Sequence, residues 1–176
     1  SSIYVLTSRT IDSSTTYSLE QFATTMFDIP TDMSFTKTIS ASYQPHGTVK
    51  NKGAVSSGAS QLIIDGATNS PNQGETFQFG GSGTTHTVTS VVATGTSNEY
   101  VISVSPTTAS ISDNTDLVFL TSRVFTGITQ VGKTVHATSG STEDGDFFYY
   151  GSATVASGGT AVFPQPAAAC DIGLDY

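Results

Sequence analysis

The chain has 176 residues, a formal net charge of −8 and only six Lys or Arg residues. Because those six residues are scattered, no basic patch could neutralise a run of phosphates, so neither nucleic acid nor an anionic membrane surface is expected as a partner. Charged residues make up 11% of the chain and nearly a third of it is Ser or Thr, a composition that suits β-sheets with neutral outer faces, which often meet other subunits. For any single face, an ordinary Thr-rich surface of a soluble β domain is favoured over a subunit contact.

The single cysteine and the hydropathy pattern indicate the cellular compartment in which the chain is made. Cys170 cannot form an internal disulfide, and beside Ala167–Ala169 it is expected to be a small buried hydrophobe. No run of about 18 apolar residues occurs, and the N-terminal residues show no signal-peptide pattern. Synthesis in a cytoplasm without a membrane stage is therefore expected.

Residues 1–45 are expected to form an N-terminal arm that begins with a short apolar run, Ile3–Leu6, able to form an edge strand or dock on a neighbour. A short helix is predicted over Ser18–Phe27, because Ser18 can cap it and Gln21 follows three residues later, as in a capping box.

A strand is predicted after the helix. Phe35–Tyr43 alternates strictly between apolar or long side chains and Ser or Thr, so one of its faces should contact water. Lys37 on this strand is expected to guard against edge-to-edge pairing. The turn at Gln44–Gly47 then leads into the next region.

The most regular pattern of the chain lies in residues 46–122. Five short runs rich in β-branched and aromatic residues are separated by turn residues, which is typical of antiparallel strands joined by tight turns. A compact barrel or sandwich of five or six strands is the simplest structure that buries their apolar faces together. The five runs are Gln61–Asp65, Thr76–Phe79, Thr85–Val92, Glu99–Val104 and Asp116–Leu120.

Residues 123–176 are expected to form a C-terminal β segment. Its predicted strands include Lys133–Ala137 and a hairpin turned by Ser157–Gly159. In the aromatic run Phe147–Tyr150, alternation places Phe148 and Tyr150 on one face and the other two rings opposite. Burial of both faces is slightly favoured over an exposed pair that would contact a partner subunit or a sugar.

Two parts of the chain carry a resemblance. The first part consists of Gly53–Gly66, Gly74–Gly80, His86–Ser90 and Ile102–Pro106. Together these segments resemble a β unit found in structural proteins of tailed-bacteriophage virions, over somewhat under half of the chain. The ending, Ser157–Pro166 followed by Ile172–Tyr176, is similar to closing segments of phage tail-tube and nozzle proteins. The resemblance implies an assembly role in a virion and does not choose between head and tail.

Residues that could carry chemistry are dispersed. His46, His86 and His136 lie far apart, and none has a His or Cys at metal-ligand spacing. The acidic run Glu143–Asp146 could hold calcium but lacks the spacing of a calcium loop, so a solvated turn is favoured. No Gly-x-Ser-x-Gly elbow occurs, and no motif nominates a pair of catalytic carboxylates. Neither an enzyme nor a bound cofactor or metal is expected.

The sequence thus predicts a mainly β virion protein whose partners are the major capsid protein or other virion proteins and copies of itself. Capsid decoration, or cement, is the leading role, and a tail component such as a tube, nozzle, adaptor or fibre-attachment subunit is the alternative. A carbohydrate- or receptor-binding module, with Phe148 and Tyr150 or Tyr100 as stacking platforms, is a third possibility. The residues expected at subunit contacts are Ile3, Tyr4, Val5, Leu6, Phe148, Tyr150, Ile172, Leu174 and Tyr176.

Overall fold

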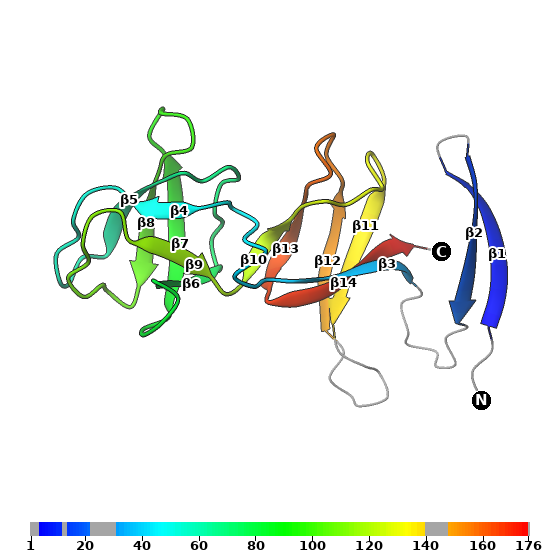
Figure 1. The fold of residues 1–176 in the computed structure, drawn as a ribbon, viewed down its shortest axis with the longest axis horizontal. Helices are drawn as coiled ribbons and strands as arrows, with labels where there is room; N and C mark the ends of the chain where they lie inside the picture. Colours follow the sequence, from blue (N-terminus) through cyan, green and yellow to red (C-terminus); the bar gives the residue numbers. More distant parts are fainter. Residues whose placement is uncertain (1–3, 12–13, 22–30, 140–147, 176) are drawn as a thin grey trace.

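In the computed structural model, residues 4–11, 14–21, 31–139 and 148–175 are described, and their regular structure consists of β-strands. The strands form a hairpin, a closed barrel, a four-stranded sheet and a two-stranded sheet (Figure 1). The mainly β fold with a small antiparallel barrel, expected from the sequence, is therefore confirmed.

The barrel is built from six antiparallel strands in the order β4-β5-β8-β7-β6-β9, and β9 closes it against β4. Strand alternation explains its core: Leu62 and Ile64 of β5 are buried inside, whereas Ile63 between them is 40% exposed. Phe77 and Phe119, which pair across β6 and β9, fill the centre. The strands are β4 (Val49–Asn51), β5 (Gln61–Asp65), β6 (Thr76–Phe79), β7 (His86–Ala93), β8 (Tyr100–Ser105) and β9 (Asp116–Phe119).

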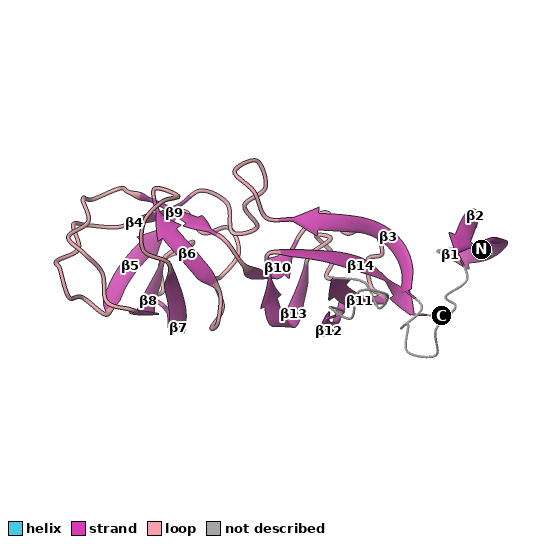
Figure 2. Cartoon of the chain, turned by 90° about the horizontal axis from the view of Figure 1, so that it is seen from below, coloured by secondary structure: helices cyan, strands magenta, loops and turns pink. Residues whose placement is uncertain are grey.

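A second β body follows the barrel and has its own core. It contains a four-stranded sheet of order β12-β11-β14-β3 and a pair, β10-β13 (Figures 1 and 2). The hairpin predicted at Ser157–Gly159 is therefore wrong: the turn is present, but β12 before it pairs with β11 and β13 after it pairs with β10. Phe125, Phe163 and Ile172 lie fully buried between these layers. The strands are β3 (Thr31–Thr38), β10 (Ser122–Phe125), β11 (Thr134–Ser139), β12 (Phe148–Thr154), β13 (Ala161–Ala167) and β14 (Ala169–Asp175).

The strand predicted over Phe35–Tyr43 is observed earlier, as β3 (Thr31–Thr38), and Ser40 and Tyr43 bridge across a turn instead of continuing it. The strand, expected in an N-terminal arm, pairs with β14 along its whole length and so joins the C-terminal sheet. It is an edge strand among the described strands, as its Lys37 suggested. The Lys37 ammonium lies 5.1 Å from the centre of the Tyr43 ring. The barrel is thus inserted between two segments of one sheet.

The N-terminal part differs from the predicted helix. β1 (Tyr4–Ile11) and β2 (Ser14–Gln21) form an antiparallel hairpin, which lies beyond the sheet in both views (Figures 1 and 2). The first residues of the predicted helix, 18–21, therefore belong to a strand, and 22–27 lie outside the described residues. Cross-strand pairing outweighs the local capping pattern here, because β1 and β2 carry several Thr residues and one Tyr each, which favour extended backbone.

Candidate functional site

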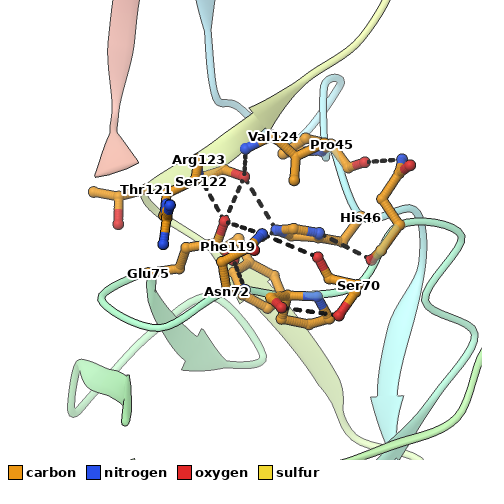
Figure 3. Close-up of polar contacts among 12 residues, drawn as sticks. Pro45, His46, Ser70, Asn72, Glu75, Phe119, Thr121, Ser122, Arg123 and Val124 are labelled. Carbon is orange, nitrogen blue, oxygen red and sulfur yellow. Dashed lines mark hydrogen bonds and ion pairs between the residues drawn. The ribbon is translucent and has the colours of Figure 1, made fainter. Parts of the chain in front are cut away.

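A buried polar cluster lies where the barrel meets the second body (Figure 3). His46 comes from the loop before β4, Glu75 from the residue before β6, and Ser122 from the start of β10; each is 0% exposed. His46 Nε2 lies 2.9 Å from Glu75 Oε2 and 3.1 Å from Ser122 Oγ. The Ser122 hydroxyl donates to Glu75 Oε1 over 3.1 Å. The cluster therefore joins three segments that are distant in sequence.

The hydrogen bonds indicate the charge state of this cluster. Besides the His46 and Ser122 contacts, the Glu75 carboxylate accepts the backbone N–H groups of Asn72 at 2.8 Å and Arg123 at 2.7 Å. The second nitrogen of the histidine, Nδ1, lies 3.1 Å from the Asn69 carbonyl oxygen. Nδ1 faces a carbonyl oxygen and Nε2 faces the Glu75 carboxyl group, so an ionised Glu75 places a hydrogen on each ring nitrogen. The geometry thus corresponds to an imidazolium paired with a carboxylate.

The pKa of Glu75 reflects two opposing effects. Burial, the larger single effect, raises the pKa by disfavouring the charged form. The hydrogen bond from His46 and its charge, together with the two backbone N–H donors, favour the carboxylate and in sum hold the pKa of Glu75 below its usual range. Glu75 is therefore ionised at neutral pH despite its burial.

A serine, a histidine and a carboxylate in contact raise the question of a hydrolase triad. In such a triad the serine and the carboxylate bind opposite nitrogens of the imidazole, so that the histidine can relay a proton. Here Ser122 and Glu75 both face Nε2, and Nδ1 is occupied by a backbone carbonyl. All three side chains are also closed to solvent. This cluster is therefore arranged to hold the junction together and not to attack a substrate.

Further polar contacts hold the same junction. The Gln44 side chain accepts from the Phe119 backbone N–H at 2.9 Å and donates to the Phe119 carbonyl at 3.2 Å, which fixes the end of β9. In the second body, the Tyr43 hydroxyl accepts from the Thr126 backbone N–H at 2.8 Å. The His46 ring contacts Phe119 with 4.5 Å between ring centres. The loop before β4 is thus bonded to both bodies.

Apolar side chains form a row on the outer wall of the barrel. Ile63 of β5 pairs with Val101 of β8, and Val101 pairs with Val92 of β7. Ile63 is 40% exposed and Val92 61%, with Val101 partly exposed between them. Strand register places three β-branched residues side by side on a rigid surface. We refer to Ile63, Val101 and Val92 as the apolar row.

The aromatic run lies at the start of β12. Phe148 and Tyr149 are 45% and 37% exposed, whereas Tyr150 packs partly against the second core. The Phe148 and Tyr150 rings lie 4.7 Å apart, and Tyr149 stacks on His136 with a 2.8 Å hydrogen bond between its hydroxyl and Nδ1. Burial of both faces, slightly favoured from the sequence, is wrong here because β12 is an edge strand of its sheet among the described strands.

The predicted contact residues at the two ends have different positions. Ile172 is fully buried in the chain's own second core and Leu174 packs partly against it, because β14 lies between β11 and β3. The expectation that Ile172 is left exposed for another chain is therefore wrong. Tyr4, Val5 and Leu6 belong to β1, whereas Ile3 and Tyr176 lie outside the described residues.

The other residues considered for chemistry are separated in space or buried. His86 is buried, with Nδ1 2.9 Å from the Pro106 carbonyl oxygen. Burial, with a contribution from neighbouring Asp171, raises the pKa of the Cys170 thiol to about 12. Within the described residues, no group of three or more His, Cys, Asp or Glu side chains could hold a metal ion. The acidic run Glu143–Asp146 lies outside these residues.

The sequence led us to consider His46 only as a possible metal ligand, and it did not identify Glu75 or Ser122. No sequence motif could have found them, since Ser122 lies 76 residues from His46. No protein-family model matches the chain, and comparisons with curated proteins and with solved structures found no similar protein. In the described ranges, no helix long and apolar enough to cross a membrane occurs.

Proposed function

We propose that this chain is a structural protein of a tailed-phage virion, which binds copies of itself and other virion proteins. Its leading role is capsid decoration, in which it stabilises the shell by binding the major capsid protein across subunit boundaries. Many repeated weak contacts on a symmetric shell add up to a large stabilisation.

The observation that carries this proposal is the apolar row on the barrel. Single exposed apolar residues are common on protein surfaces, but contiguous ones mark interaction sites. The apolar row spans three neighbouring strands of a closed barrel, so its shape is fixed before binding. Exposed apolar side chains also occur on the second body, where Phe148 is 45% and Val162 48% exposed. Both bodies thus offer surfaces that a partner could cover.

A tail component is the second candidate, and one observation favours it. The ending that resembles closing segments of tail-tube and nozzle proteins forms β13 and β14 of the second body. Residues Ile172–Leu174 pair with both β11 and β3. That segment therefore builds the sheet, as a closing segment with a structural role would.

The copy number of this chain in purified particles, measured by quantitative mass spectrometry against the major capsid protein, tests both roles. Decoration predicts a number comparable with that of the capsid protein. About six, twelve or a few dozen copies would assign the chain to the portal or tail, where ring symmetry sets the count. Absence from the particles would refute the virion proposal.

A variant tests the apolar row itself. The double substitution Ile63→Lys and Val92→Lys adds charge at exposed positions of the row, so the barrel should still fold but incorporation into particles should fall. Thr89→Lys, at another exposed position of β7, is the matched control and should incorporate normally. Normal incorporation of the double variant would contradict the role of the row.

A further inference from the structure

A groove of about 470 Å³ lies at the end of the barrel where β7 finishes and β8 begins. Val91 and Ser90 of β7 and Tyr100 of β8 line one side, and the loop of residues 70–73 before β6 lines the other. Binding sites for small molecules commonly have volumes of about 300 to 1000 Å³ and often occur at the mouths of β-barrels. The groove therefore has the size and the place of a small-ligand site.

The loop that forms one wall is held by the buried junction cluster. Glu75 accepts the backbone N–H of Asn72 at 2.8 Å and its side-chain amide at 3.3 Å. The same amide donates to the Ser70 carbonyl at 3.2 Å, and Pro71 is buried. Because His46 and Ser122 fix Glu75 in turn, the wall is preorganised, which reduces the entropy lost on binding.

The lining residues define the chemistry of a ligand. They offer amides from Asn72 and Gln73, hydroxyls from Ser70 and Ser90, and the half-buried ring of Tyr100, and none of them is charged. Within the described part of the chain, the side chains of Gln73 and Tyr100 make no hydrogen bond with protein. A phosphorylated or strongly charged ligand would find no counter-charge among these lining residues.

We infer that this groove binds a neutral saccharide, with a sugar ring against Tyr100 and its hydroxyl groups bonded to the side-chain oxygen of Asn72 and to the side-chain amide of Gln73. A sugar combines an apolar C–H face with several hydroxyls, which matches one aromatic ring beside uncharged donors and acceptors. Such a site goes beyond the assembly role, because it would let a virion protein contact glycans.

Titration of the isotope-labelled full chain with maltotriose, cellotriose, chitotriose and lactose, followed by amide NMR shifts, tests the inference. At least one sugar, raised to about 10 mM to detect millimolar affinity, should shift the amides of residues 70–73, 90–93 and 100 with saturation. No shift at these amides with any of the four sugars would overturn the inference.

Substitutions can distinguish sugar binding in the groove from sugar binding at other exposed aromatic side chains. Gln73→Ala, at an exposed loop position, and Tyr100→Ala should each weaken binding by about tenfold or more. Tyr149→Ala, which removes an exposed ring on the second body, is the control and should bind as the unmodified chain does. Equal binding by Gln73→Ala and the unmodified chain would refute the assigned site even if Tyr100→Ala failed to fold. The copy number in particles is independent of this outcome.

Discussion

Replacing Glu75 with Gln should destabilise the protein far more than an ordinary carboxylate-to-amide change. The side chain keeps its shape, but the five donor groups around the carboxylate cannot all be satisfied, because one oxygen becomes an NH₂ group. The imidazolium of His46 also loses its counter-charge in a site that is 0% exposed. Both effects act on groups that water cannot reach.

The magnitude follows from the burial of the pair. Removing one partner of a buried ion pair costs about 3 to 5 kcal/mol, because it leaves an uncompensated charge. For a chain of this length, 1 kcal/mol changes the melting temperature by about 2 to 4 °C, so a fall of about 6 to 20 °C is expected. Asp116→Asn is the matched control. Asp116 pairs with Lys50 at 3.6 Å, and their side chains are 57% and 41% exposed, so that change should cost only about 0 to 1 kcal/mol.

Urea and thermal unfolding followed by far-ultraviolet circular dichroism measure both variants under the same conditions. The charge assignment at the junction is refuted if Glu75→Gln lowers the free energy of unfolding no more than Asp116→Asn does. A double variant, His46→Leu with Glu75→Gln, should recover part of the loss, because it removes the uncompensated charge of His46 while the amide oxygen at position 75 can still accept a backbone N–H. If the double variant has a lower free energy of unfolding than Glu75→Gln, the second substitution has only added another packing defect, and the cluster stabilises the fold through packing instead of charge.

Three further predictions concern pH, a thiol and a glycine. Because the pKa of Glu75 is lower in the folded state, ionised Glu75 stabilises the fold above the ordinary glutamate pKa of about 4.3. This stabilisation is lost as the pH falls from about 4.3 through the folded-state pKa. The free energy of unfolding, measured across that pH window, should therefore fall less steeply for Glu75→Gln than for the unmodified chain. With a pKa of about 12, buried Cys170 should not react with a thiol reagent at pH 8 until the chain is unfolded, and rapid reaction of the native chain would contradict its burial. Gly66→Ala should lower the free energy of unfolding in urea by about 1 to 3 kcal/mol more than Gly53→Ala does. Both glycines have positive φ, but only a Cβ on residue 66 would clash with the Thr48 carbonyl oxygen. Equal losses of stability in the two variants would show that this close approach is unimportant.

The barrel strands were predictable because each is a local pattern. Gln61–Asp65 and Thr76–Phe79 match β5 and β6 residue for residue, since alternation and flanking turn residues are readable within a few positions. The prediction of an N-terminal helix was wrong because it, too, rested on local signals. Its signals at Ser18 and Gln21 were local too, but β1 pairs with this segment over eight positions from Tyr4 to Ile11.

The sequence by itself determined a charge-poor, Thr- and Ser-rich β protein and the positions of its central strands, because composition and alternation act over short distances. Only the tertiary structure decided the partners of those elements: β14 between β11 and β3, Ile172 inside the core, and His46 against Glu75 and Ser122. These contacts join segments far apart in sequence, and they depend on which edges meet when two cores close around their apolar faces. Periodicity along the chain carries no information on that choice, since every half-apolar strand can in principle pair with any other.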